Sequence, residues 1–190
     1  MDAILLSFGV IFLAELGDKS QLMALAFAAR FPALPVLVAI TLATALVHAG
    51  SVVLGATVAI ALPTNVISIV AGLAFLGFAA WTLRGDELTE DDEERAARAS
   101  TSSVIVTVGT AFFLAELGDK TMLATVTLAT HESLLGTWVG STAGMVVADA
   151  IAIGIGRLMG RRLPERAIRI GAAVAFVAFG LILIWDGLRS

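Results

Sequence analysis

Six long apolar segments make up most of this chain, and they constrain its fold more than any other feature. Each is long enough, at about 1.5 Å rise per residue, to cross a hydrocarbon core of about 30 Å as a helix. Helices are expected because lipid offers no partner for backbone amides, and the alternating pattern of a membrane barrel strand is lacking. The segments are 3–29, 36–62, 65–84, 103–130, 135–159 and 167–188. The sequence therefore predicts an all-α, polytopic membrane protein with six transmembrane helices.

Composition narrows the class of protein further. Hydrophobic residues make up 58% of the chain and charged residues 15%, whereas soluble domains are about 45–50% apolar. The chain has no cysteine, which excludes disulfides and a thiolate site for a soft metal. It also lacks a basic patch with interleaved aromatics, so nucleic acid is not an expected partner. No HExxH motif, phosphate loop or Ser/His/Asp set indicates catalysis, and the chain is not expected to be an enzyme.

The two halves of the sequence repeat each other at an offset of 101 residues. This offset pairs Phe12 with Phe113 in the first and fourth segments, and it holds without a gap as far as Phe78 and Phe179. One register across three segments does not readily arise by chance. The chain is therefore expected to contain two copies of a three-helix unit.

This repeat predicts the domain organisation. Residues 1–84 form the first three-helix repeat, 103–190 form the second, and 85–102 form an acidic linker between them. A unit with three crossings enters the membrane from the opposite side in its second copy. We therefore expect inverted repeats related by a pseudo-twofold axis in the membrane plane, a plan common among secondary transporters.

Arginine placement predicts how these helices are oriented, because cytoplasmic loops carry an excess of basic residues. Nine arginines fall on one side of the expected helices: Arg30, Arg84, Arg95, Arg98, Arg157, Arg161, Arg162, Arg166 and Arg169. The other side has only Arg189. We expect the arginine-rich side and the linker to be cytoplasmic and both termini to lie outside.

The pentapeptide Glu-Leu-Gly-Asp-Lys occurs once in each half, at residues 15–19 and 116–120. Both copies lie inside apolar segments, where each ionisable side chain costs about 2.5–3.5 kcal/mol. Glu15 lies roughly 18 Å into its segment, so the motif is expected near the bilayer centre. On a continuous helix, the Glu, Asp and Lys of each motif share one face with Leu22 or Leu123. Antiparallel packing of the first and fourth segments is expected to bring the two faces together.

The charges of the two motifs predict a site for a divalent cation. Four carboxylates and two ammoniums leave a net charge of −2, which one such cation neutralises. The expected metal ligands are Glu15, Asp18, Glu116 and Asp119, with Ser20, Gln21 and Thr121 as possible auxiliary ligands. Sites made only of oxygen suit Ca²⁺, Mn²⁺ or Mg²⁺ better than copper or zinc. We expect Lys19 and Lys120 to balance charge, holding the carboxylates together when no metal is bound.

Several interpretations of single residues stay open. The Glu and Lys of each motif also fit an i, i+4 ion pair that only locks a helix. Gly17 and Gly118 allow the helix to open or another helix to approach closely. Asp149, and His48, which aligns with it at the same offset, are candidates for a proton relay or for buried packing residues. Tight helix contact is the expected role of three glycines at GxxxG spacing, Gly136, Gly140 and Gly144.

Residues 14–20 and 115–121 resemble the paired E-x-G-D-[KR]-[ST] signatures of the Gdt family. The resemblance covers essentially the whole chain, with six helices, two inverted halves and an acidic central linker. It implies a Ca²⁺/Mn²⁺ transporter that exchanges its cation for H⁺. It also implies a cation site on Glu15, Asp18, Glu116 and Asp119, with Ser20 and Thr121 in the hydroxyl position. His48 and Asp149 lie outside the signature, so the resemblance assigns them no role.

These observations predict a secondary transporter of Mn²⁺ and/or Ca²⁺ that works by cation/H⁺ antiport. Buried carboxylates tend to hold protons, and a divalent cation displaces those protons because its ligands must be ionised. The compact length is typical of a bacterial inner-membrane protein, for which we expect Mn²⁺ export from the cytoplasm. The expected partners are the cation, H⁺ and the lipid bilayer, with no cofactor besides the transported ion. The oligomeric state is not predicted.

Two other functions remain compatible with the sequence. An exporter of an organic cation, such as a basic amino acid, would use the acidic residues to hold an ammonium, although the two motif lysines disfavour it. A non-transporting membrane assembly factor would tolerate the loss of all four motif acids, whereas a carrier would not.

Overall fold

The computed structural model describes residues 2–84, 104–159 and 165–189, and every regular element within them is a helix. In chain order the helices are α1 (Ala3–Glu15), α2 (Lys19–Arg30), α3 (Ala33–Ala61), α4 (Thr64–Arg84), α6 (Val104–Glu116), α7 (Lys120–Ala129), α8 (Leu134–Met159) and α9 (Glu165–Arg189). The predicted all-α class is therefore confirmed. The expected linker, 85–102, lies outside the described residues, so the boundary between the repeats stays a prediction.

Four long helices match four of the expected membrane segments. By length and apolar composition, α3, α4, α8 and α9 are each able to cross a membrane. The chain leaves α3 and enters α4 at Pro63, whose ring lacks the N–H that a continuing helix would need. Many large apolar side chains of these helices are exposed on the outside of the bundle, among them Leu46, Ile60 and Val70. Such a surface suits lipid.

The first and fourth segments are each two helices rather than one. α1 ends at Glu15 and α2 begins at Lys19, while α6 ends at Glu116 and α7 begins at Lys120. With 13 and 12 residues, α1 and α2 are about 20 and 18 Å long, so neither alone spans a core of about 30 Å. The expectation of a continuous helix is wrong for these two segments.

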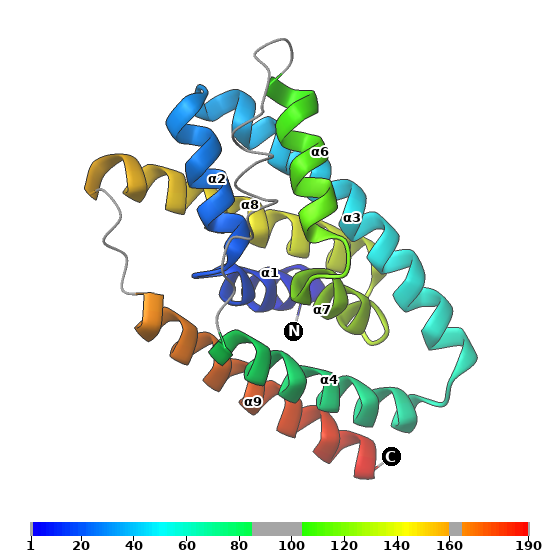
Figure 1. Cartoon of the computed structure of the whole chain (residues 1–190). Coiled ribbons are helices and arrows are strands. Elements are labelled where there is room, and N and C mark those ends of the chain that lie inside the picture. The colour runs from blue at the N-terminus through cyan, green and yellow to red at the C-terminus, as the bar shows by residue number, and fades with distance from the viewer. Residues whose placement is uncertain (1, 85–103, 160–164, 190) are drawn as a thin grey trace.

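The short helices pack across the two halves of the sequence. α1 lies along α8, and α6 lies along α3 (Figure 1). The glycines of α8 allow this approach: a Cβ on Gly144 would lie 2.6 Å from the Phe8 carbonyl oxygen of α1, and one on Gly140 would overlap the Ile4 carbonyl. The tight contact predicted from their spacing is confirmed. The first and fourth segments contact each other in the crossed sense that antiparallel packing predicts, α1 with α7 and α2 with α6, although α1 and α6 each pack mainly on a long helix of the other half.

α4 and α9 run side by side along one side of the bundle (Figure 1). Their backbones approach at glycines, and a Cβ on Gly72 would lie 2.6 Å from the Gly180 carbonyl oxygen. Phe75 packs against Phe176 and Phe179, with ring centroids 5.9 and 5.0 Å apart. The same hydrophobic core includes side chains of α1 and α7. This helix pair thus supports the broken helices from one side.

Candidate functional site

Each broken helix turns at the glycine of its motif. Gly17 and Gly118 have φ angles of +76° and +81°, in the left-handed region that residues with a Cβ rarely adopt. In the first turn the Asp18 N–H donates to the Glu15 carbonyl at 3.1 Å, and the second motif makes the equivalent bond at 3.2 Å. The motif therefore consists of a glutamate that ends one helix, a Leu-Gly turn, and an aspartate that precedes the next. The expectation that its charged residues share one helix face is wrong, and the alternative that the helix opens at glycine is confirmed.

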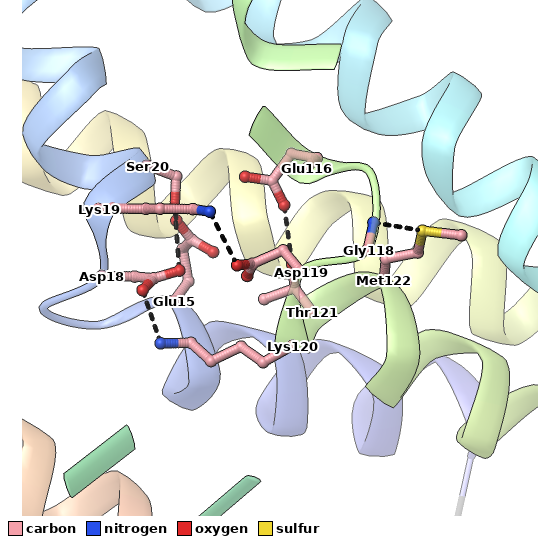
Figure 2. A network of polar contacts seen from close by, with 10 residues as sticks. All are labelled: Glu15, Asp18, Lys19, Ser20, Glu116, Gly118, Asp119, Lys120, Thr121 and Met122. Carbon is pink, nitrogen blue, oxygen red and sulfur yellow. Dashed lines mark hydrogen bonds and ion pairs between the residues drawn. The ribbon is translucent and has the colours of Figure 1, made fainter. Parts of the chain in front are cut away.

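The lysine of each motif forms an ion pair with the aspartate of the other motif (Figure 2). Lys120 Nζ lies 2.6 Å from Asp18 Oδ1, and Lys19 Nζ lies 3.2 Å from Asp119 Oδ1. Each aspartate also occupies the N-cap position of α2 or α7, where the partial positive charge of the helix favours an anion. These pairs join the two motifs, which a purely local i, i+4 pairing of Lys19 would not do.

The two ion pairs differ in how deeply they are buried. The side chain of Lys19 is 24% exposed, whereas that of Lys120 is 4% exposed, and both partner aspartates are buried. A cation removed from water depends on its partner far more than one at a surface. Lys120 therefore depends on its ion pair with Asp18 more than Lys19 depends on its pair with Asp119.

The motif glutamates end α1 and α6 and are fully buried. Ser20 Oγ donates to Glu15 Oε1, and Thr121 Oγ1 donates to Glu116 Oε2 at 2.8 Å (Figure 2). Within the described residues, the other oxygen of each carboxylate has no hydrogen-bond partner. An unsatisfied buried polar group costs about 1–3 kcal/mol. These two oxygens are therefore open positions for a cation or a proton.

The four motif acids converge without forming a closed metal cage. Glu15 interacts electrostatically with both Asp18 and Glu116, so carboxylates of the two motifs face a common region (Figure 2). In the part of the chain that the structure describes, no three His, Asp or Glu side chains are grouped as they would be around one metal ion. Two of the four carboxylates, Asp18 and Asp119, are held against ammonium groups.

Asp149 and His48, which align at the offset of 101, lie on α8 and α3 and are fully buried. Asp149 interacts electrostatically with Glu15 and Glu116, so α8 brings it to the motif carboxylates. No charged residue among those described acts on His48 in the same way. Neither Asp149 oxygen and neither His48 ring nitrogen has a hydrogen-bond partner in the same set of residues. The structure thus brings one of the two candidate relay residues to the motifs.

Both motifs lie in the parts of the chain that match a known protein family. The family model described as "Divalent cation/proton antiporter GDT1" matches residues 3–90 and 104–190, which contain both motifs. The chain belongs to the GDT1 family. It is therefore an integral membrane protein of a transporter family rather than of an enzyme family.

Curated relatives of this GDT1-family chain match it over most of its length. A Vibrio cholerae protein named "Putative manganese exporter" is 37% identical over 95% of this chain and 90% of its own. GDT1-like protein sll0615 of Synechocystis is 28% identical over 93% of each chain. Protein PAM71 of Arabidopsis thaliana chloroplasts is 30% identical over 94% of this chain, which spans 55% of that relative. No solved structure matches this chain.

One difference between the two motifs of this GDT1-family chain was missed from sequence. Gln21 and Met122 hold equivalent positions, but only Gln21 has two polar arms. Its Oε1 accepts from the Gly17 N–H at 2.9 Å, and its Nε2 donates to the Ala148 carbonyl at 3.1 Å. Met122 offers only its sulfur to the equivalent N–H, at 3.1 Å. Gln21, expected as an auxiliary ligand, thus anchors the first break to α8 beside Asp149. The signal in the sequence is the unequal residue that follows the motif hydroxyl.

Proposed function

We propose that this chain exchanges a divalent cation, Mn²⁺ and/or Ca²⁺, for protons across a bacterial inner membrane, and that it exports Mn²⁺ from the cytoplasm. The family is one of divalent cation/proton antiporters, and a bacterial relative bears the name of a manganese exporter. The observation that carries the proposal is the buried cluster itself. Each half supplies one Glu-Asp-Lys set, and ion pairs across the motifs join the two sets.

The proposed architecture has six crossings in two inverted three-helix repeats, with α1–α2 and α6–α7 each crossing as a broken helix. A twofold operation that exchanges the halves also exchanges the two Lys–Asp pairs with each other. Residues near such an axis should meet their own equivalents. Thr44 Oγ1 donates to Met145 Sδ at 3.3 Å, and Phe75 packs against Phe176, each pair being 101 positions apart. The arginine distribution supports a cytoplasmic linker and outside termini.

The helix ends that meet at the breaks favour a cation. α1 and α6 direct their C-termini, the negative ends of their dipoles, toward Glu15 and Glu116. The positive ends of α2 and α7 are already matched by Asp18 and Asp119. Broken helices of this kind form substrate sites near the bilayer midplane in many transporters. The two glutamates and two aspartates would together line the cation site.

Coupling follows from charge balance in the proposed site. Each Lys–Asp pair is neutral, so the two glutamates carry the net charge of −2. Either one divalent cation or two protons balance that charge, and cation binding requires ionised carboxylates. Alternating access of one repeat against the other would then carry a cation one way and protons the other.

Reconstitution tests this proposal directly. Purified protein is placed in liposomes with an acidic lumen, and uptake of Mn²⁺, Ca²⁺ and Mg²⁺ is measured side by side, with lysine as a competitor. We expect uptake of Mn²⁺ or Ca²⁺ that collapses with the pH gradient. Glu15→Gln and Asp119→Asn should each abolish it without preventing insertion, whereas Glu132→Gln, in the loop after α7, should not. Normal transport by both site variants would refute the assignment, and strong inhibition by lysine would favour an organic cation.

A further inference from the structure

Five carboxylates are buried among the described residues, and their surroundings divide them into two groups. The first group consists of Asp18 and Asp119, whose negative charge is balanced by two sources of positive charge. Each precedes the positive N-terminus of a helix, and each pairs with a lysine from the other motif. These two side chains already have the cationic partners that a buried anion requires, although neither Asp119 oxygen has a hydrogen-bond partner within the described residues.

Glu15 and Glu116 belong to the second group. They stand at the negative ends of α1 and α6, where a helix disfavours an anion. A hydroxyl binds one oxygen of each, while Glu15 Oε2 and Glu116 Oε1 have no hydrogen-bond partner within the described residues. Within the described residues neither glutamate forms an ion pair such as the two aspartates have, although the Lys19 ammonium interacts electrostatically with Glu116.

Asp149 joins the second group from a different helix. Its side chain is fully buried, and neither carboxylate oxygen has a hydrogen-bond partner in the described part of the chain. Asp149 interacts electrostatically with Glu15 and also with Asp18 of the same motif. It also interacts with Glu116. A wholly unsatisfied carboxylate in an apolar helix is costly, and its position beside two other unsatisfied acids points to a shared cationic ligand.

We propose that Asp149 is a fifth carboxylate of the cation site and binds the transported ion together with Glu15 and Glu116. These three side chains are not grouped around one point in the described residues, so ion binding would draw them together. The two Lys–Asp pairs remain closed beside the ion and hold the broken helices in place. This inference rests on the proposed antiport function and assigns which acids meet the ion. Three carboxylates carry one more negative charge than a divalent cation balances, which leaves room for one proton in the loaded site.

The position of Asp149 makes the site asymmetric. Its equivalent in the first repeat is His48, which interacts with no carboxylate of the described residues in this way. Gln21 Nε2 also binds the carbonyl of Ala148, the residue next to Asp149, at 3.1 Å. The first motif is thereby held against the turn of α8 that carries the fifth acid. The ion should therefore sit nearer to α8 than to α3.

Binding of Mn²⁺ to the purified full-length chain in detergent tests the inference, with free Mn²⁺ measured by its electron paramagnetic resonance signal. Asp149→Asn removes the charge at nearly constant volume, and Asp149→Glu keeps it. Thr137→Val is the matched control, because Thr137 is buried on the same helix without a side-chain partner in the described residues, about 18 Å away along the axis. We expect Asp149→Asn to weaken Mn²⁺ binding at least tenfold, Asp149→Glu to retain more affinity than Asp149→Asn, and Thr137→Val to match the wild type.

The outcomes separate this inference from the proposed function. Wild-type affinity in Asp149→Asn, alongside loss of binding in Glu15→Gln, would overturn the role of Asp149 and leave the antiport proposal intact. Absence of Mn²⁺ and Ca²⁺ binding in the wild type would overturn both. Should Asp149→Asn fail to give a monodisperse protein, the wild type decides through carbodiimide labelling and mass spectrometry. Protection of Asp149 by Mn²⁺ supports the inference, and labelling of Asp149 that Mn²⁺ does not reduce, or no labelling of it, counts against it.

Discussion

Lys120 Nζ lies 2.6 Å from Asp18 Oδ1, although 102 positions separate the two residues in the chain. Lys19 and Asp119 make the equivalent pair in the opposite sense, at 3.2 Å. Neither lysine position is explained by its own helix, because each ammonium reaches the motif of the other half. The two ion pairs therefore link the breaks of both helices, so a substitution in one motif is expected to alter the other motif as well.

Removing the buried lysine should destabilise the protein more than removing the partly exposed one. Lys120→Met takes the ammonium away from Asp18, which stays charged in an apolar setting, and the expected cost is about 3–5 kcal/mol of unfolding free energy. Lys19→Met should cost clearly less, because 24% of the Lys19 side chain is exposed. Thermal or denaturant unfolding of both variants in detergent measures the difference in their unfolding free energies. The double variant Lys120→Met/Asp18→Asn should recover part of the loss, and equal effects of the two single variants would contradict the unequal burial.

Replacing Gly118 with alanine should lower stability because of the backbone conformation alone, without a steric clash. A Cβ on Gly118 would meet no atom within 4 Å, but its φ is +81°. A left-handed conformation costs about 1–2 kcal/mol for a residue with a Cβ, so Gly118→Ala should lose about that much stability and also lower the transport rate. The control is Gly77→Ala in α4, where space is equally open and φ is not positive. That variant should be neutral or slightly stabilising, and an unaffected Gly118→Ala would argue against the turn.

Close packing of α1 on α8 predicts a position-dependent effect of alanine along one helix. A Cβ on Gly140 would overlap the Ile4 carbonyl, whereas a Cβ on Gly154 would meet no atom within 4 Å. Gly140→Ala should therefore push α1 away and destabilise the protein by about 1–3 kcal/mol. Gly154→Ala should instead gain up to about 1 kcal/mol from helix propensity. Melting curves of the two variants decide between this result and a uniform effect of alanine.

Much of the fold could be predicted from the sequence because membrane helices are selected by local composition. The long apolar runs gave the four helices α3, α4, α8 and α9 nearly to their ends, and the glycine spacing predicted the contact that Gly140 makes. The first and fourth segments were predicted as single helices because hydropathy does not detect a break within an apolar run. Gly17 and Gly118 offered the only local signal, and a helix also tolerates glycine where a neighbour packs closely.

The sequence predicted which residues of the two motifs form the candidate site, but not the ion pairs and helix contacts that bring them together. Two charged pentapeptides at equal depth are costly in lipid, which identifies Glu15, Asp18 and their equivalents without any coordinates. The pairing of each lysine with the distant aspartate, and the approach of Asp149 but not His48, depend on which helices touch. Those contacts arise when α1 packs on α8 and α6 on α3.

The amino-acid sequence was enough to predict a helical, duplicated chain that is apolar enough for a membrane and carries two sets of charges within its apolar segments. These properties follow from hydropathy and spacing, which act over a few helical turns. The packed structure was needed to show where two helices break, which lysine pairs with which aspartate, and which carboxylate oxygens lack a hydrogen-bond partner among the described residues. Electrostatic and hydrogen-bond energies depend on distances between residues far apart in the chain, and packing of the helices sets those distances.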